Sequence, residues 1–303
     1  MAKIALLVGV NYYNTANRLN GCVGDIINMR NMLIDAYGYL PGNIILLHDD
    51  VNNKIKANGL PTCDNIIGYL AYFAANSSKM SQFWFHYSGH GAQIKDKNGD
   101  EADGLDDVIV PLDYQRRGFI VDDDILTIVK QIKCDTMLLF DSCHSGTVCD
   151  LPWSFECLAK NLYKSTKVNN ISLTNPNIHM FSGCKDNQTS ADTYDAVSKK
   201  WVGAFTEAFI ESLRSSGHNV AMPVLHRKIC NWLLSKGHRQ IPLYSASSNN
   251  PNYVLNKTLS SGKKEVLLSN VSSAKDKGNP FASLRFSLNP STIPMVFNTY
   301  LKE

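Results

Sequence analysis

Short apolar runs alternate along this chain with amphipathic segments that are long enough to form helices. Such an alternation is typical of parallel sheets, so it predicts an α/β fold in which helices cover both faces of a mostly parallel central sheet. The predicted strands are 4–10, 44–48, 83–87, 108–110, 137–140, 178–181 and 241–246. The predicted helices span 23–37, 64–76, 122–132, 203–214 and 223–236.

Two polar motifs follow directly on predicted strands. The sequence SGHG at 88–91 comes after strand 83–87, and FDSCHSG at 140–146 comes at the end of strand 137–140. Ligands of open α/β sheets bind at the carboxyl ends of the strands. We therefore expect both motifs at the same edge of the sheet.

Composition excludes several classes of function. A chain that is 44% hydrophobic and 19% charged is an ordinary globular protein. Its formal charge of +3, without any long basic run, argues against a nucleic-acid partner. No stretch approaches the roughly 18 apolar residues of a membrane helix, which predicts no membrane partner. The initial MAKIALLVGV is followed by no small-residue cleavage site, so it resembles a buried strand more than a signal peptide.

The eight cysteines form neither a CxxC pair nor the spacing of a zinc site. Disulfide scaffolds are typical of short secreted chains, so this cysteine usage favours reduced thiols and a cytoplasmic protein. No His/Cys cluster supports zinc.

The chain divides by composition into four parts. We expect residues 1–155 to form a large region that contains both motifs, and 177–258 to form a smaller region that completes the same domain. The polar segment 156–176 between them, rich in Asn, Ser and Lys, is predicted to be an exposed connector. The pattern weakens after about residue 258, and no role is assigned to the extension 259–303.

Cys143 and His90 are candidates for a nucleophile and its base. A cysteine nucleophile needs a histidine that accepts the thiol proton and returns it to the leaving group. Each motif alone has a plain structural alternative, which is a histidine in a glycine turn or an inert buried cysteine. Their occurrence together, each after an apolar run and 53 residues apart, favours catalysis. The backbone N–H groups of Gly91 and Cys143 would then face a developing oxyanion.

HYSGHG (86–91) followed by FDSCHSG (140–146) resembles the metacaspases, which belong to the caspase-like clan of cysteine peptidases together with caspases and legumains. The resemblance extends over most of the chain, to about residue 256. It includes LLVGVNYY, LNGCVGD, DGLDDVIVPLDY, GFIVDDDI, FSGCKDNQTSADT and GAFTEAF. The short connector is more similar to type I metacaspases than to the long-linker type, but no Pro/Gln-rich region precedes the first strand.

The resemblance implies a caspase-like αβα sandwich with Cys143 as nucleophile and His90 as general acid and base. His144 is the competing base. Since neighbouring residues tend to point to opposite sides, His144 is poorly placed to share the Cys143 proton.

The resemblance also implies a substrate preference. Asp25, Ser88 and Asp141 match the positions that line the primary specificity pocket of metacaspases. Converging carboxylates favour a guanidinium or ammonium group, so we expect cleavage of protein or peptide substrates after Arg or Lys. The structural alternative for Asp25 is a charge that interacts with a helix dipole.

Residues 96–124 carry ten acidic and three basic side chains, although the whole chain is positively charged. Acidic runs are usually solvated faces, but crowded carboxylates are also the ligands of Ca²⁺, which takes six to eight oxygens. The run is not an EF-hand, because Glu101 stands where glycine is required. The resemblance implies instead a calcium site at Asp106, Asp122, Asp123 and Asp150.

The favoured interpretation is a calcium-activated, monomeric cysteine endopeptidase. Because an exposed connector is open to proteolysis, self-cleavage is expected after Lys160, Lys164 or Lys167. The alternative is a metacaspase-like binding or proteostasis factor whose peptidase activity is dispensable or absent. A third interpretation, an Asp-specific caspase, would require a basic pocket where the matching positions are acidic.

Overall fold

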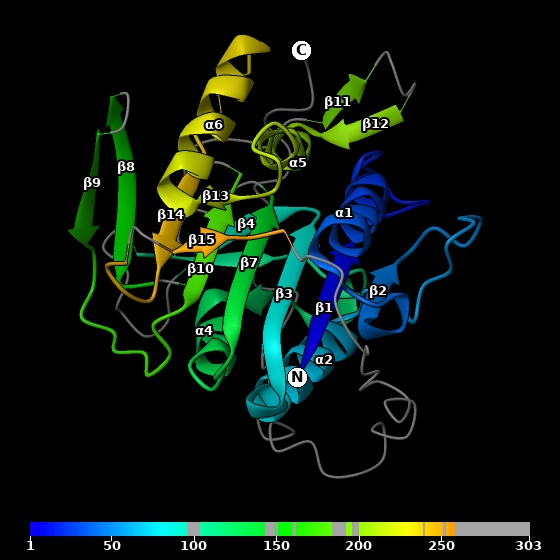
Figure 1. Ribbon diagram of the computed structural model, residues 1–303. Helices are drawn as coiled ribbons and strands as arrows, with labels where there is room; N and C mark the ends of the chain where they lie inside the picture. Colours follow the sequence, from blue (N-terminus) through cyan, green and yellow to red (C-terminus); the bar gives the residue numbers. More distant parts are fainter. Residues whose placement is uncertain are drawn as a thin grey trace.

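An eight-stranded sheet with the order β2-β1-β3-β7-β10-β14-β8-β9 forms the centre of the computed structural model (Figure 1). Its strands are β1 Ala2–Gly9, β2 Ile44–His48, β3 Met80–Ser88, β7 Asp135–Asp141, β8 Trp153–Ala159, β9 Leu162–Lys167, β10 Ile178–Ser182 and β14 Leu243–Ala246. The structure describes residues 1–95, 104–142, 149, 151–159, 162–183, 192–195, 200–238, 240–250 and 253–257.

Parallel pairing joins β2, β1, β3, β7 and β10, and antiparallel pairing adds β14, β8 and β9. The strand β7 is buried along Thr136–Asp141, and β3 is buried except at Ser81. Strands that are covered on both faces lose the polar–apolar alternation of a half-exposed strand. The predicted α/β fold class is therefore confirmed.

Helices form a layer on each face of this sheet (Figure 1). The helices α2 (Cys63–Asn76) and α4 (Asp122–Val129) cover one face, where Ile4, Leu6 and Val8 point. The helices α1 (Cys22–Tyr37), α5 (Ala204–Arg214) and α6 (Met222–Ser235) cover the other, where Ala5, Leu7 and Trp84 point. Two apolar cores therefore lie on opposite sides of one sheet.

Of three smaller sheets among the described residues, the first two lie at the edge where the parallel strands end. One contains β4 (Gly91–Lys95), β5 (Leu105–Ile109) and β6 (Ile120–Val121), and it begins immediately after His90. The hairpin of β11 (Asp192–Asp195) and β12 (Lys200–Gly203) leads into α5. The strands β13 (Val220–Ala221) and β15 (Val254–Leu255) form the third pair. Short turns of helix are α3 (Tyr114–Arg117), η1 (Pro41–Asn43) and η2 (Ser77–Lys79).

The segment 156–176, which we expected to be an exposed connector, contains most of a hairpin that the sequence did not predict. The strand β8 pairs with β14, and β9 pairs with β8 at the edge of the sheet. Residues 163, 164, 166 and 167 of β9 are exposed. Because β9 is exposed and pairs only with β8, its composition is that of a loop, and the strand escaped prediction.

Residues 258–303 lie outside the described part of the chain, as do Cys143, His144, Asp150 and Lys160. Among the described helices, none combines the length and the apolar character that crossing a bilayer requires.

Candidate active site

The two sequence motifs meet at the carboxyl ends of β3 and β7, as predicted. Ser88 lies directly opposite Asp141 in the parallel register, and Gly9 at the end of β1 lies opposite Ser88. The N–H of Gly89 extends the pairing by donating to the Asp141 carbonyl at 3.2 Å. His90 follows Ser88 by two residues, just as Cys143 follows Asp141, although Cys143 is outside the described residues.

His90 is half-buried and its ring is oriented by a backbone carbonyl. Its Nε2 lies 2.7 Å from the carbonyl oxygen of Asn17, which can only accept a hydrogen bond. Nε2 therefore carries the ring hydrogen, and Nδ1 is the nitrogen that can take up a proton. The ring also packs on Tyr12, with 4.7 Å between the two centroids.

Two buried tyrosine hydroxyls hold the backbone of His90. The Tyr12 hydroxyl accepts from the His90 N–H at 3.1 Å and donates to the Val110 carbonyl at 2.6 Å. The Tyr87 hydroxyl lies 2.7 Å from the His90 carbonyl oxygen. Burial raises the pKa of Tyr12 well above its usual value, so its hydroxyl stays a neutral donor. Tyr12 has a φ of 51°, a left-handed conformation that is uncommon for a large side chain and is typical of functional sites.

Glycine is required beside these hydroxyls. A Cβ at Gly89 would lie 2.5 Å from the Tyr87 hydroxyl oxygen, so a side chain at position 89 would push Tyr87 away from His90. At the next glycine, the hydrogen bond from the Val110 N–H to the His90 carbonyl places Gly91 and Ile109 in a non-hydrogen-bonded pair of β4 and β5. The Gly91 N–H is therefore not used in that ladder. Its predicted role as an oxyanion donor stays a prediction.

Beside His90, two buried carboxylates converge on Gly203. Asp25 in the first turn of α1 and Asp141 at the end of β7 are 1% and 4% exposed. The Gly203 N–H donates to Asp25 Oδ1 at 2.8 Å, and the Ser88 hydroxyl donates to Asp25 Oδ2 at 2.7 Å. A Cβ at Gly203 would lie 2.3 Å from Asp141 Oδ2 and 2.7 Å from Asp25 Oδ2, so only glycine fits between them.

Thr206, in the first turn of α5, holds Asp141. Its backbone N–H and its hydroxyl both donate to Asp141 Oδ2, at 3.0 and 2.7 Å. The donors to Asp25 and Asp141 named here are neutral, so they orient the carboxylates without cancelling their charge. The site thus holds two carboxyl groups in a largely desolvated place.

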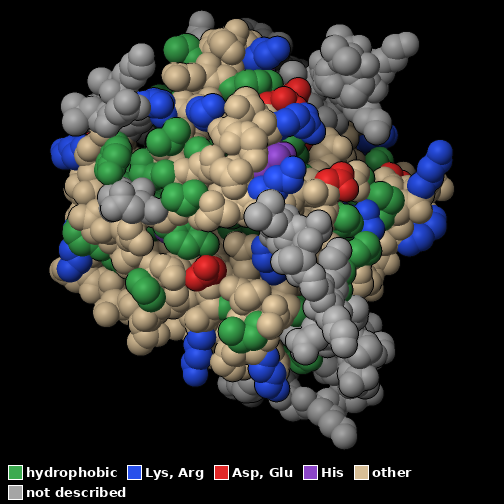
Figure 2. Space-filling model, viewed as in Figure 1, with side chains coloured by type: hydrophobic (Ala, Val, Ile, Leu, Met, Phe, Trp, Pro, Cys, Tyr) green, Lys and Arg blue, Asp and Glu red, His purple; other side chains and the backbone are tan. Residues whose placement is uncertain are grey.

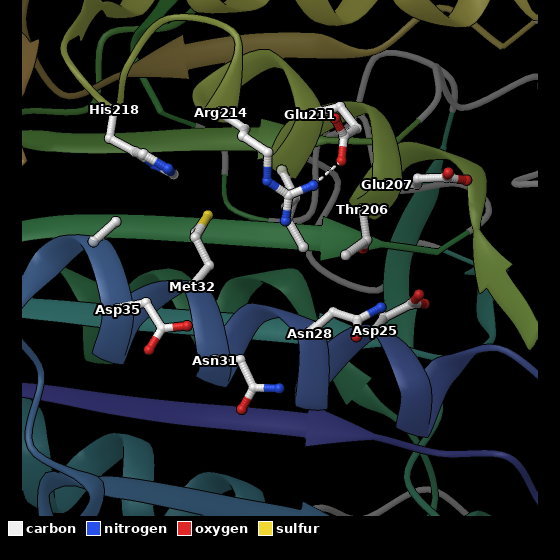
Figure 3. Close-up of a pocket in the computed structure, with 12 residues that line it drawn as sticks. Asp25, Asn28, Asn31, Met32, Asp35, Thr206, Glu207, Glu211, Arg214 and His218 are labelled. Carbon is white, nitrogen blue, oxygen red and sulfur yellow. Dashed lines mark hydrogen bonds and ion pairs between the residues drawn. The ribbon is translucent and has the colours of Figure 1, made fainter. Parts of the chain in front are cut away.

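A groove of about 390 Å³ runs between α1 and α5 and has Asp25 and Thr206 at one end (Figure 3). Farther along it, Arg214 pairs with Glu211 of the same helix. Acidic side chains outnumber basic ones in its lining, which consists of Asp25, Asn28, Asn31, Met32, Asp35, Ala36, Thr206, Glu207, Ile210, Glu211, Arg214 and His218. On the molecular face viewed in Figure 2, charged side chains of both signs are scattered among uncharged ones.

The predicted calcium ligands Asp106 and Asp122 are both buried, at 6% and 2% exposed. Asp122 Oδ2 accepts from the Asp107 N–H at 3.0 Å, which ties the start of α4 to β5. Asp123 is half-buried, and Asp150 lies outside the described residues. Burial and the neighbouring Asp123 raise the pKa of Asp124 to about 6. The described residues alone contain no group of three acidic, His or Cys side chains placed to hold a metal.

Comparison with known proteins decides the family. Residues 3–152 match the family described as "Metacaspase, peptidase C14 domain". Metacaspase-1 of Meyerozyma guilliermondii is 35% identical over 291 residues, which cover 81% of this chain and 69% of that protein. The chain belongs to the metacaspase family. Metacaspase-1 of Kluyveromyces lactis is 34% identical over 290 residues, and this metacaspase chain spans 65% of its length.

Solved structures support a caspase-like fold for this metacaspase. A protein from Geobacter sulfurreducens aligns with a TM-score of 0.58 and 22% identity, over 82% of this chain and 95% of its own. Caspase-1 from Spodoptera frugiperda aligns with a TM-score of 0.50 and 10% identity, over 82% and 89%. At these identities the likeness concerns the fold alone.

The residues that orient the site are not among those predicted from the sequence. Asn17, Tyr12 and Tyr87 hold His90, while Gly203 and Thr206 hold the two carboxylates. The motifs NYY, HYSGHG and GAFTEAF contain all of these except Asn17, but nothing in their spacing shows which atoms meet.

Tyr12→Phe removes one hydroxyl and leaves the His90 N–H and the Val110 carbonyl without that partner. We expect the free energy of unfolding to fall by about 1–3 kcal/mol, and the His90 amide to exchange its hydrogen faster. Urea unfolding and amide hydrogen exchange measure the two effects.

The matched control is Tyr39→Phe, which removes a buried hydroxyl that donates to Gln82 far from His90. It should lose stability without faster exchange at His90. Unchanged exchange at His90 in Tyr12→Phe would contradict the role assigned to Tyr12.

Proposed function

We propose that this metacaspase is a calcium-activated cysteine endopeptidase that cleaves peptide bonds after Arg or Lys. The observation that carries the proposal is the pair of buried carboxylates, Asp25 and Asp141, beside a histidine whose tautomer is set by Asn17. A charged pocket next to a poised base supports cleavage after a cationic side chain.

Formation of the acyl-enzyme requires a proton to move twice. His90 Nδ1 accepts the proton of the Cys143 thiol, and the thiolate attacks the carbonyl carbon of the substrate. The N–H groups of Gly91 and Cys143 stabilise the negative oxygen that forms. His90 then gives its proton to the departing amine, and water hydrolyses the acyl-enzyme to regenerate the thiol.

Charge and burial support the substrate class. Two carboxylates at 1% and 4% exposure repel each other and are poorly solvated, so a cation beside them is favourable. A guanidinium can bind carboxylates through two parallel hydrogen bonds, and an ammonium can bind as a point charge. An aspartate side chain would add a third negative charge to the same place.

Fluorogenic peptides ending in Arg, Lys or Asp test this proposal directly. We expect the wild type to cleave the Arg and Lys peptides, and Cys143→Ala and His90→Ala to lose about 10³-fold or more in kcat. His144→Ala should retain more activity than either. Asp25→Asn should lower kcat/KM for the Arg peptide by about 30-fold or more, because a desolvated charge pair is lost.

Preferred cleavage after Asp would refute the assigned specificity. A folded wild-type protein without peptidase activity, assayed with and without calcium, would favour a binding or proteostasis factor instead.

We further propose that Asp106, Asp122, Asp123 and Asp150 hold Ca²⁺. The described part of this set fits a hard cation, because oxygen is its only donor type and two of the carboxylates are buried. Bound Ca²⁺ would neutralise the crowded carboxylates and favour one arrangement of the segments that carry them. The strand β5 connects this place to the base, since Asp106 lies near its start and the Val110 N–H just after it donates to the His90 carbonyl.

Peptidase activity should therefore rise with calcium and saturate, with a midpoint of about 10⁻⁴–10⁻³ M, the range of weak carboxylate sites. The double variant Asp122→Asn, Asp123→Asn should lose this response. Asp35→Asn, which removes an exposed carboxylate on α1, should keep it. Activity that is insensitive to a chelator would contradict the proposal.

We also propose self-cleavage, in a segment that is partly a β-strand and not the exposed connector expected from the sequence. Lys164 and Lys167 lie on β9, which is exposed and pairs on one side only. An edge strand must separate from β8 before its backbone can enter a cleft, so cleavage there requires local opening of the hairpin. Lys160 precedes β9 and lies outside the described residues.

Added calcium should convert wild-type protein into two fragments, while Cys143→Ala stays at full length. Intact-mass spectrometry over time identifies the cut, and replacement of Lys160, Lys164 and Lys167 by Gln should abolish it. A wild type that hydrolyses peptide yet remains uncut would show that this segment is not a processing site.

We also propose a cytoplasmic monomer. The edge strand β9 exposes Lys164 and Lys167, and lysines on an edge strand disfavour pairing with a second sheet. Among the described residues, Cys63 and Cys134 are free thiols, which supports a reducing compartment.

A further inference from the structure

His86 is a buried histidine that the proposed chemistry does not use. It lies on β3 between Trp84 and Ser88 on the same face, and it is 0% exposed. Its partners in the sheet register are Leu7 on β1 and Leu139 on β7. An apolar side chain between Leu7 and Leu139 would be more stable than histidine, because a buried imidazole loses its hydration.

The contacts of His86 lead to Asp141. Its Nε2 lies 3.2 Å from the Thr206 hydroxyl oxygen, which lies 2.7 Å from Asp141 Oδ2. Burial lowers the pKa of His86 to about 3, so the ring is neutral at ordinary pH. Within the described residues, Nδ1 is buried and has no hydrogen-bond partner.

The single hydrogen of the Thr206 hydroxyl makes this chain directional. An ionised Asp141 can only accept, so the Thr206 hydroxyl must donate to it. The hydroxyl oxygen then has only lone pairs to offer His86, which must carry its hydrogen on Nε2. The other tautomer would accept the threonine hydrogen and take it away from Asp141. It would also bury Nδ1–H as an unpartnered donor, and orphaned donors are rarer in proteins than orphaned acceptors.

We propose that His86 is a positioning residue for substrate specificity, acting through Thr206 to keep the Asp141 carboxylate ionised and aimed at a cationic substrate side chain. This inference rests on the proposed Arg/Lys specificity. It explains a polar side chain placed directly beneath Ser88 and Asp141 in an otherwise apolar row.

The test compares peptides ending in Arg with those ending in citrulline, which is close to Arg in shape but uncharged. In His86→Leu the ratio of kcat/KM for the two peptides should fall by about tenfold, the worth of one hydrogen bond to a charged group. Relative to wild type, His86→Leu should change KM for the Arg peptide by a larger factor than it changes kcat for the citrulline peptide. His86→Gln keeps an amide N–H of similar reach and should restore most of the ratio.

A double-mutant cycle separates positioning from general stability. Thr206→Val should lower the Arg/citrulline ratio, and adding His86→Leu to it should produce no further loss, because both changes break the same chain. The matched control is His179→Leu on β10, which removes another buried histidine with one hydrogen bond, to the Tyr244 hydroxyl at 2.9 Å. It should lower stability and leave the ratio unchanged.

The outcomes are distinguishable. If the wild type does not discriminate Arg from citrulline, the proposed specificity itself fails. If the wild type discriminates, three results would each overturn the role of His86. The first is an Arg/citrulline ratio in His86→Leu that equals the wild-type ratio. The others are a folded His86→Gln that does not restore the ratio, and losses that add up in the double-mutant cycle. Should His86→Leu not fold, the His86→Gln and Thr206→Val comparison decides the matter alone.

Discussion

The parallel register of β3 and β7 is the constraint on which the whole site depends. It places Ser88 opposite Asp141, and therefore brings two motifs from distant parts of the chain to one edge of the sheet. A shift of one residue would turn every side chain of a strand to the opposite face. Burial on both faces, with separate apolar cores around α2 and α1, makes such a shift costly.

Neutral donors orient the negative charges at this edge. Ser88, Gly203 and Thr206 donate to Asp25 and Asp141 from three different elements, and His86 extends the network below them. Hydrogen bonds to a carboxylate favour its charged form, whereas burial disfavours it. The proposed cationic substrate side chain would meet these two buried carboxyl groups at the edge of the sheet.

The base is held by a second and separate network. Asn17 sets the tautomer of His90, while Tyr12 and Tyr87 bridge its backbone to Val110 at the end of β5. Since β5 also carries Asp106 and Asp107, this strand links the acidic cluster to Val110, whose N–H donates to the carbonyl of His90, the proposed base. This continuity gives a physical route by which a cation at the cluster would influence the base, because a strand paired on both sides moves as a unit.

The amino-acid sequence determined the α/β class, most of the central strands, and the edge at which SGHG and FDSC meet, because burial on both faces leaves continuous apolar runs. Only the tertiary structure decided which polar atoms meet there. Tyr12 and Thr206 acquire their roles from hydrogen bonds to residues 78 and 65 positions away, and no local pattern encodes such partners. The β8–β9 hairpin escaped prediction for the same reason: its sequence resembles a loop, and its conformation comes from pairing with β14.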